Sequence, residues 1–594
     1  MLWTRSAPCD SHEECTVRTE SPEPEPGAGP PNEGYLRSRG GVRSNYSEAI
    51  DALFKERDAP GRAGGVLAVI KDGEVVHQRG YGVANLEYDV PFGAQTVMRL
   101  GSTTKHLCAT CILILENRGK LSLADDVRKF IPELPDYGAV VDIRHLLNMT
   151  SGFPDGLNLP LLVGVPAPPR LLRSQILDLQ IRQTRLMYAP GAHCSYSNTN
   201  FNVLSLVIER LAGVTLAEFM KAELFTPLGM NSTKLVPFDH EPIARHATGY
   251  LKEGTGETQI GHMPTELCGD GGVDTTVEDM LRWFENFRND RHFGPNYRDR
   301  METVGVLLDG TSTQYALGLT VGHHRGLRRV GHAGGMPGFL CDFVHYPDVD
   351  LGVVLLWNWM DTTVLESANS ICDIVCAVEI RAAGGEPGAR LRVDDSDPVL
   401  APVTGSYACP ETGYLIHFDH GQSGVLCSIQ GDETYLIRAP EGRYVSAKLA
   451  QGFEMRVLSG DAENLRPKLE IRFGALDPMS FEPIADEPVE LKDLSAYQGR
   501  YRSEVFGETC TINSVEGRLQ IELESRLREL LWKELLPIRE NFFAALIPGT
   551  TNFTNVSIRF LRNKADHVTG FEYRLSRISG IRFERISEDS PWIR

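Results

Sequence analysis

Ser102 and Lys105 are the first residues in this chain whose types and spacing could support catalysis. If a helix begins at the serine, the lysine lies on the same helical face, within reach of the hydroxyl. A serine hydroxyl needs a nearby base before it can attack a carbonyl carbon. A desolvated lysine can lose its proton and act as that base. Taken alone, Ser-Thr-Thr-Lys also fits an N-capping serine followed by a surface lysine.

A second candidate group is Tyr196-Ser197-Asn198, which follows Pro190-Gly191 and precedes a predicted helix. We therefore expect it on a loop. A tyrosine hydroxyl directed at the serine could pass a proton to the leaving group. The Asn198 amide could hold the lysine or a substrate carbonyl, so it is a predicted substrate-binding group. In isolation, a polar turn explains the same residues.

The third candidate group is His-Ala-Gly-Gly at 332–335, which continues a predicted strand. The small residue Gly334 would let a substrate backbone lie along the strand edge, which makes it a predicted binding position. The N–H of Gly335, together with that of Ser102, could form an oxyanion hole. For His332 alone, a hydrogen-bonded structural histidine is the alternative interpretation.

The elements that must position these groups follow from the hydrophobic pattern. Residues 64–70 read as a buried strand, and Asp72-Gly73 as the turn to a second strand over 74–77. Strands at both ends of the region with helices between them indicate an α+β layout. Helices are predicted from 102 to 119 and over about 200–211 and 276–287, and antiparallel strands over 315–321, 327–330, 339–346 and 351–357.

The remainder of the chain divides by composition. Residues 1–42 are rich in Pro, Glu and Gly and predict a disordered extension. A domain with the candidate groups spans 43–380, and a Gly- and Pro-containing linker spans 381–397.

The last two hundred residues read as a repeat of about one hundred, as expected for a duplication. Gly-Ser-Tyr at 405–407 and Gly-Arg-Tyr at 499–501 open the two copies, and Phe-Glu-Pro-Ile at 481–484 and Phe-Glu-Arg-Ile at 583–586 close them. Short alternating strands between these motifs predict two small antiparallel β-barrels, over 398–488 and 489–594.

The three candidate groups occur in the order Ser-x-x-Lys, Tyr-x-Asn and His-x-Gly, on a helix start, a loop and a strand. With His-Leu-Leu-Asn-Met-Thr-Ser-Gly at 145–152 and Gly-Asp-Gly-Gly-Val at 269–273, the pattern resembles the serine β-lactamase and penicillin-binding-protein superfamily, in its class C branch. The likeness spans about residues 48–378. It implies a β-lactamase/transpeptidase-like domain that acts through an acyl-enzyme.

This resemblance also implies roles for the catalytic residues. Ser102 would be the nucleophile, and Lys105 and Tyr196 would share general-base and general-acid duty in proportions that the sequence does not divide. His332 would complete the catalytic set. Asn198 and His332 would position the other groups of the site. The chemistry needs no metal or cofactor.

The third motif narrows the choice within the superfamily. Carboxypeptidases and many β-lactamases carry Lys-Thr-Gly there, whereas this chain has His332, which is less suited to a substrate carboxylate. With two trailing barrels, the chain is similar over about 48–594 to the D-aminopeptidase family, which removes N-terminal D-residues from peptides and amides. An esterase, a β-lactamase or a D-Ala-D-Ala carboxypeptidase on the same scaffold is the alternative, and a ligand-binding protein without turnover is a further one.

In the D-aminopeptidase family, a loop of the last barrel enters the active site and presents an acidic group to the substrate ammonium. The matching stretch here is about 523–537, and Glu534 is the candidate substrate-binding carboxylate. A carboxylate in a closed pocket would favour a free amine over a free acid. A solvated surface glutamate is the alternative interpretation.

Composition limits which partners, cellular locations and metal sites the protein can have. The net charge of −19 argues against nucleic acid as a partner. The sequence has no apolar run of about 18 residues and no apolar stretch near its N-terminus, so we expect a cytoplasmic protein without a membrane span. Among the 12 cysteines, Cys108-x-x-Cys111 sits alone in an apolar helix and indicates core packing rather than a metal site. The related enzymes suggest a homodimer that acts on a small peptide, amide or ester.

Overall fold

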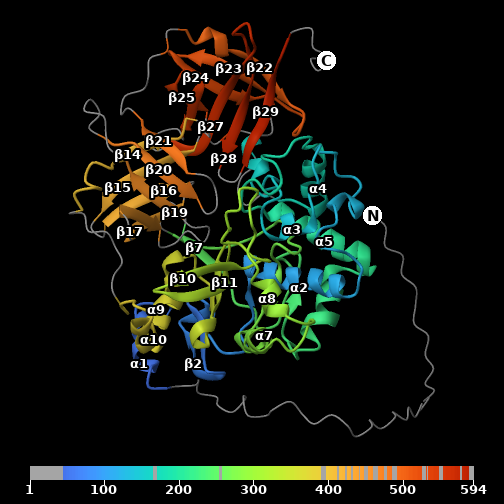
Figure 1. Cartoon of the computed structure of the whole chain (residues 1–594), viewed down its shortest axis with the longest axis vertical. Coiled ribbons are helices and arrows are strands. Elements are labelled where there is room, and N and C mark those ends of the chain that lie inside the picture. The colour runs from blue at the N-terminus through green and yellow to red at the C-terminus, as the bar shows by residue number, and fades with distance from the viewer. Residues whose placement is uncertain are drawn as a thin grey trace, which may run out of the picture. The chain divides into compact units, whose positions relative to one another are not determined.

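The computed structural model describes most of the chain from residue 44 onward (Figure 1). The predicted disordered extension over 1–42 lies outside the described residues, and the predicted domain boundaries stay predictions. The described residues are 44–59, 61–164, 170–252, 257–388, 397–410, 414–421, 424–429, 432–439, 442–446, 453–458, 466–473, 478–484, 491, 493–524, 530, 533–546, 553–575 and 578–587.

Six antiparallel strands form the central sheet, in the order β10-β11-β12-β13-β1-β2. The first of these strands in the sequence, β1, pairs with the last, β13, so that Gly65 lies opposite Trp357. Strands from both ends of the region therefore meet in one sheet, and the prediction of an α+β fold is confirmed. The strands are β1 (Gly65–Lys71), β2 (Glu74–Tyr81), β10 (Thr320–His324), β11 (Leu327–Met336), β12 (Phe339–Tyr346) and β13 (Leu351–Trp357).

The predicted strand over 315–321 is wrong in its first half. Gly318 adopts a φ of 70°, and Ala316 N donates to Leu319 O across a tight turn, so the strand begins only at Thr320. The next strand, β11, continues through the glycines at 334 and 335 to Met336, in agreement with the prediction that residues 332–335 continue the strand over 327–330. The turn at Asp72 and Gly73 is as predicted, with φ values of 52° and 80°.

Helices fill the sequence between β2 and β10, as predicted. Helix α2 is buried from Thr104 to Leu115, and Cys108 and Cys111 lie in its hydrophobic core. The main helices are α1 (Ser47–Phe54), α2 (Thr104–Asn117), α3 (Ile143–Leu147), α4 (Arg173–Arg182), α5 (Asn198–Ala212), α6 (Leu216–Met220), α7 (Val277–Asn289), α8 (Tyr297–Met301), α9 (Ser367–Val375) and α10 (Ala377–Ala382).

Short strands outside the central sheet pair in small groups beside the helices. The sheet of β5, β9 and β6 joins the segment before α2 to the segment before α7, with Arg99 opposite Asp274. These strands are β3 (Val83–Asn85), β4 (Val90–Pro91), β5 (Met98–Arg99), β6 (Lys234–Leu235), β7 (Tyr250–Lys252), β8 (Thr258–Ile260) and β9 (Val273–Thr275).

Two closed antiparallel barrels follow, which confirms the predicted architecture. The first closes where β14 pairs with β21, and the second where β22 pairs with β29. The strands are β14 (Gly405–Ala408), β15 (Leu415–Gly421), β16 (Gly424–Ile429), β17 (Asp432–Ala439), β18 (Arg443–Ser446), β19 (Phe453–Val457), β20 (Leu469–Phe473), β21 (Met479–Pro483), β22 (Gly499–Ser503), β23 (Glu508–Val515), β24 (Arg518–Leu523), β25 (Glu534–Arg539), β26 (Phe542–Leu546), β27 (Phe553–Arg562), β28 (Val568–Leu575) and β29 (Ile578–Ile586).

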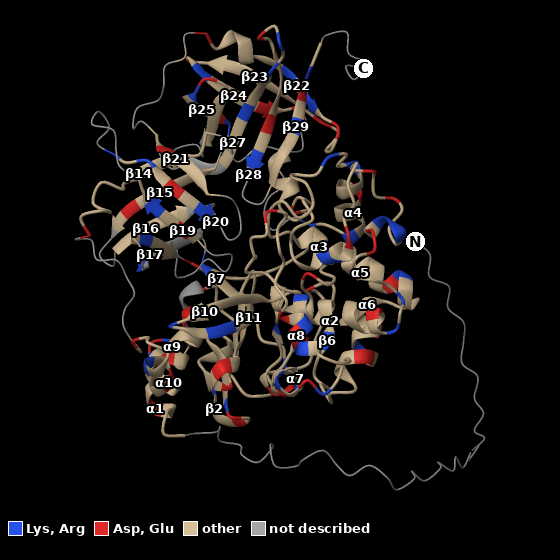
Figure 2. Cartoon of the chain, in the orientation of Figure 1, with Lys and Arg blue, Asp and Glu red and all other residues tan. Residues whose placement is uncertain are grey.

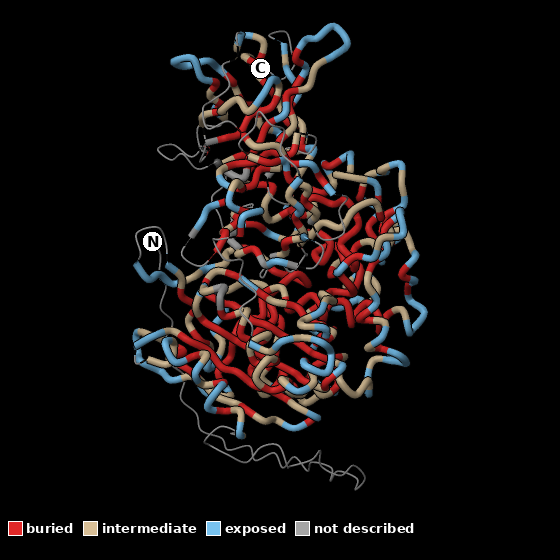
Figure 3. The backbone as a smooth tube through the Cα atoms, turned by 60° about the vertical axis from the view of Figure 1, so that its left-hand side comes forward, coloured by how far each residue is buried: buried red, intermediate tan, exposed pale blue. Residues whose placement is uncertain are grey.

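Three neighbouring strands of the central sheet, β1, β12 and β13, are almost continuously buried. Every residue of β12 and β13 is buried, as expected for strands covered on both faces (Figure 3). Charged residues are spread over the helices and the barrel strands (Figure 2). In the described part of the chain, no helix has both the length and the apolar character needed to cross a bilayer.

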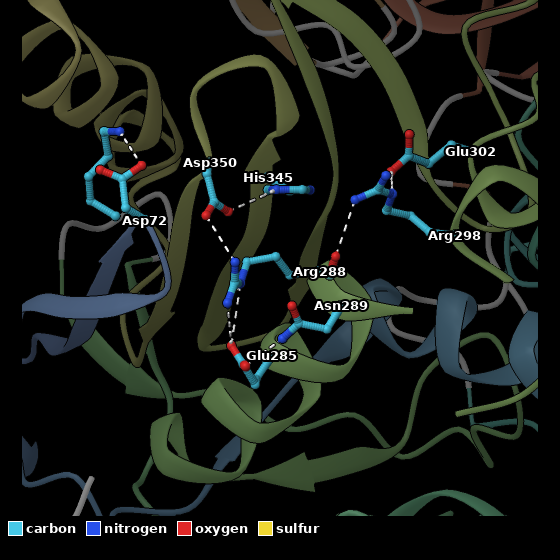
Figure 4. Close-up of polar contacts among 9 residues, drawn as sticks. Asp72, Glu285, Arg288, Asn289, Arg298, Glu302, His345 and Asp350 are labelled. Atoms are coloured by element: carbon cyan, nitrogen blue, oxygen red, sulfur yellow. Dashed lines mark hydrogen bonds and ion pairs between the residues drawn. The ribbon is translucent and has the colours of Figure 1, made fainter. Parts of the chain in front are cut away.

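A polar cluster ties α7 to the turn between β12 and β13 (Figure 4). Arg288 of α7 donates to Asp350 at 3.0 Å and to Glu285 at 3.3 Å. Beside it, His345 is buried against the ring of Phe284, 5.3 Å away. Burial, with the charges of nearby arginines, lowers the pKa of His345 to about 3. Within the described residues, neither ring nitrogen of His345 has a hydrogen-bond partner.

We expect His345→Phe to reduce the acid sensitivity of the fold. The folded protein keeps His345 neutral, whereas the unfolded chain protonates it below a pH of about 6.5. The wild-type free energy of unfolding should therefore fall as pH drops below that value, by about 2 kcal/mol more than in the variant at pH 5. Urea unfolding at pH 7.5 and pH 5 measures the difference. Equal losses in both proteins would contradict this expectation.

Candidate active site

Ser102 lies in a single helical turn, η2 (Gly101–Thr103), that leads directly into α2. The preceding Gly101 has a φ of 51°, which favours glycine. A Cβ on Gly101 would lie 3.0 Å from the backbone nitrogen of Gly335 in β11. The absence of a side chain at Gly101 therefore lets the strand carrying Gly335 approach the turn that carries Ser102.

Side chains also fasten this turn to the sheet. Thr103 Oγ1 donates to the carbonyl of His332 at 2.9 Å, and Cys341 Sγ donates to the carbonyl of Leu100 at 2.7 Å. Gly334 fits in the gap only because it is glycine, since a Cβ there would lie 1.9 Å from the same Leu100 carbonyl. The backbone of β11 is thus held against the serine-bearing turn.

Lys105 is fully buried in the first turn of α2. Its Nζ lies 3.0 Å from Ser102 Oγ, 2.9 Å from Asn198 Oδ1 and 2.8 Å from the carbonyl oxygen of Asp270. Asn198 is the first residue of α5, which packs beside α2. The structure therefore brings three of the predicted residues, Ser102, Lys105 and Asn198, into direct contact.

The three neighbours of Lys105 Nζ differ in what they can do. The Asn198 and Asp270 carbonyl oxygens can only accept hydrogen bonds, whereas the Ser102 hydroxyl can donate or accept. An ammonium would donate to all three. A neutral amine would donate to the two carbonyls and keep its lone pair for the serine proton. The same arrangement therefore suits both protonation states of the lysine.

Asp270 contributes a charge as well as a carbonyl. Its carboxyl group is buried next to Lys105 and accepts from the backbone N–H of Cys268 at 3.1 Å. Burial raises the pKa of Asp270 to about 6, and the nearby Lys105 opposes that rise. Asp270 lies in the Gly-Asp-Gly-Gly-Val stretch at 269–273 that contributes to the family resemblance, but the sequence alone predicts no role for it.

Aromatic rings line the other side of Lys105. The ring centroid of Tyr196 lies 4.8 Å from Lys105 Nζ, and the ring meets that of Tyr315 edge-on at 6.0 Å. Tyr315 OH lies 2.9 Å from His332 Nε2, while His332 Nδ1 lies 2.6 Å from the carbonyl of Ala333. Because a carbonyl only accepts, Nδ1 carries a proton, and in a neutral ring Nε2 accepts from the tyrosine.

Besides Asp270, sequence reasoning missed two further residues of this site, Tyr315 and Asp155. Tyr315 was placed in a strand by its hydrophobic neighbours, and its contact with His332 depends on the turn before β10. The other is Asp155, whose buried carboxylate accepts from Asn198 Nδ2 at 3.1 Å and 3.3 Å. Its one sequence signal is its position just after the matched stretch 145–152.

Glu534 has a different setting from the one predicted. It lies in β25, opposite Gln520, and its carboxylate accepts from Arg518 at 3.0 Å. Among the described residues, no contact joins Glu534 to the Ser102 site. Residues 525–529, 531 and 532 of the predicted loop lie outside the described part of the chain. The role of Glu534 therefore stays a prediction.

An α+β domain with a serine and a buried lysine in contact at a helix start defines the class of serine acyl-transfer enzymes. Residues 50–370 match the Beta-lactamase family, and the chain belongs to that family. The resemblance to the β-lactamase and penicillin-binding-protein superfamily is thereby confirmed.

Curated relatives extend the likeness into the barrels. The D-aminopeptidase of Brucella melitensis biotype 1 is 25% identical over 544 residues, which are 88% of this chain and 96% of that protein. The D-aminopeptidase of Brucella anthropi is 28% identical over 411 residues, or 68% of this chain and 75% of that protein. These relatives agree with the prediction of a serine hydrolase enzyme.

Among solved structures, the octameric penicillin-binding protein homologue from Pyrococcus abyssi is similar in fold. It matches with a TM-score of 0.51 and 23% identity, over 73% of this chain and 99% of that one. The D-amino acid amidase from Ochrobactrum anthropi matches with a TM-score of 0.49 and 21% identity, over 57% of this chain and 100% of that one.

We expect Gly334→Ala to separate β11 from the serine-bearing turn. The new Cβ would meet the Leu100 carbonyl at 1.9 Å, and the resulting shift should destabilise the fold by about 2–3 kcal/mol. Gly335→Ala is the matched control, because its Cβ would meet only Leu340, at 3.4 Å. Thermal unfolding of both variants measures the effect, and equal stability in the two would contradict the close approach of strand and turn.

Proposed function

We propose that this protein is a serine hydrolase that releases N-terminal D-amino acids from peptides or amides through an acyl-enzyme. The family membership supports the acyl-transfer chemistry, and the D-aminopeptidase relatives, aligned over most of this chain, support the substrate class. The observation that carries the proposal is the 3.0 Å contact between Lys105 Nζ and Ser102 Oγ in a buried setting.

The first half of the proposed reaction forms the acyl-enzyme. Ser102 Oγ attacks the carbonyl carbon of the scissile bond, and its proton passes to Lys105 Nζ. The N–H groups of Ser102 and Gly335 stabilise the negative charge on the carbonyl oxygen. As the carbon–nitrogen bond breaks, the leaving amine takes a proton from Lys105 or Tyr196.

The second half releases the acid. Water attacks the ester carbon and gives a proton to the same base, and the Ser102 oxygen leaves and recovers its proton. Asn198 orients the lysine, and Gly334 offers a strand edge to the substrate backbone. No step draws on a metal or cofactor.

One observation separates this substrate class from the nearest alternatives. His332 occupies the position of the lysine that holds a substrate carboxylate in related carboxypeptidases, and both of its nitrogens are engaged, by Tyr315 and the Ala333 carbonyl. A site without that fixed cation favours substrates with a free amine over those with a free acid. We extend the proposal to a cytoplasmic protein that forms a homodimer. Light scattering on the purified protein would test the homodimer.

A serine-directed fluorophosphonate should label the wild-type protein on Ser102 and leave Ser102→Ala unlabelled. The hydroxyl is the attacking group, and the variant should lose at least about 10³-fold in kcat/KM. Intact-protein mass spectrometry checks the labelling. Labelling of both proteins to the same extent would contradict the assignment of the nucleophile.

The substrate class is tested by three compounds presented at equal concentration: D-alanine 4-nitroanilide, L-alanine 4-nitroanilide and 4-nitrophenyl butyrate. We expect the highest kcat/KM on the D-anilide, with Ser102→Ala as the inactive control. Cleavage of the ester alone would exclude the aminopeptidase and point to an esterase. Labelling without turnover of any compound would point to a binding protein.

A further inference from the structure

Asp155 is a buried carboxylate directly behind the candidate active site. Its two oxygens accept from Asn198 Nδ2 at 3.1 Å and 3.3 Å. The oxygen of the same amide, Asn198 Oδ1, accepts a hydrogen bond from Lys105 Nζ at 2.9 Å. One amide thus connects the carboxylate to the amine that contacts Ser102.

The Asp155 carboxylate determines the orientation of the Asn198 side-chain amide. An ionised carboxylate has acceptors only, so it favours the orientation that turns the NH₂ group toward Asp155 and the oxygen toward Lys105. In the reversed orientation, the NH₂ group would face Lys105 Nζ and could donate to its lone pair. That lone pair would then no longer be available for the Ser102 proton.

The orientation matters because of the other contacts of Lys105. The carbonyl of Asp270 already accepts one N–H of the amine at 2.8 Å. With Asn198 Oδ1 as a second acceptor, a neutral lysine uses both of its N–H groups, and its lone pair points to the remaining neighbour, Ser102 Oγ.

We propose that Asp155 is a positioning residue that fixes the Asn198 amide so that the Lys105 lone pair is reserved for Ser102. The inference rests on the proposed function, since it concerns the base of the same acyl-transfer site. Among the described residues, the contacts of Asp155 run to Asn198, Leu157 and Asn158 and not to Ser102. Asp155 acts through one amide and one amine.

Asp155 is itself well placed for this role. The backbone N–H of Leu157 and the side-chain amide of Asn158 each donate to the carboxylate at 3.2 Å. The preceding carbonyl, Pro154 O, accepts from Thr199 Oγ1 at 2.8 Å, which joins this segment to the first turn of α5. The Asp155 carboxylate and the Asn198 amide therefore belong to two segments that are hydrogen-bonded to each other.

Two substitutions at Asp155 should weaken its control of the Asn198 amide to different extents. Asp155→Ala removes the acceptors, and Asp155→Asn keeps the shape but allows either amide orientation. We expect the rate of fluorophosphonate labelling at Ser102 to fall on the order of 10²-fold in the first and about 10-fold in the second. KM for the D-anilide should change less than kcat, because the proposed role of Asp155 is exerted through Asn198 on Lys105 rather than on substrate binding.

Asn158→Ala is the matched control. It removes one donor to the same carboxylate without touching Asn198. We expect it to lower the thermal midpoint as much as Asp155→Asn does and to leave the labelling rate within about threefold of wild type. A loss of labelling in Asn158→Ala equal to that in Asp155→Ala would mean that the segment is needed only for local folding.

The outcomes separate the inference from the proposed function. If the wild-type protein is not labelled, the proposed function fails. If the wild type is labelled and both Asp155 variants are labelled at the same rate, only the positioning role fails. Slow labelling in the Asp155 variants, with the control unaffected, supports the role of Asp155.

Discussion

The contact of the Lys105 amine with its acceptors is the constraint on which the rest of the site depends. A fully buried amine is costly unless hydrogen bonds replace its water. Here the replacements come from a serine in the same turn, an asparagine at the start of α5 and a carbonyl just before β9. These parts of the chain must therefore converge for the domain to bury this lysine.

A second constraint is steric and lies on the opposite side of Ser102. The strand β11 reaches the serine-bearing turn only where side chains are missing, at Gly101 on the turn and Gly334 on the strand. Thr103 and Cys341 then close the remaining space with hydrogen bonds. The same close approach brings the backbone nitrogen of Gly335 to the turn that carries Ser102, as the proposed oxyanion hole requires.

The sequence predicted what depends on local pattern and missed what depends on tertiary contact. The spacing of Ser102 and Lys105 and the short apolar runs of β12 and β13 identified their elements directly. The contacts of Asp155 and Tyr315 have no local signal in the sequence, because their partners lie 43 and 17 residues away. The start of β10 was mispredicted for a related reason, because the glycine turn at Gly318 overrides the apolar periodicity of residues 315–319.

The setting of His332 indicates which substrates the site can distinguish. Its ring is held between the hydroxyl of Tyr315 and the carbonyl of Ala333, and a neutral imidazole satisfies both. The same Tyr315 ring packs against Tyr196, so the histidine and the tyrosine beside Lys105 share one support. A fixed positive charge, which would attract a substrate carboxylate, is not required to hold this arrangement together. Selection for a free amine can therefore arise without any change to the acyl-transfer machinery around Ser102.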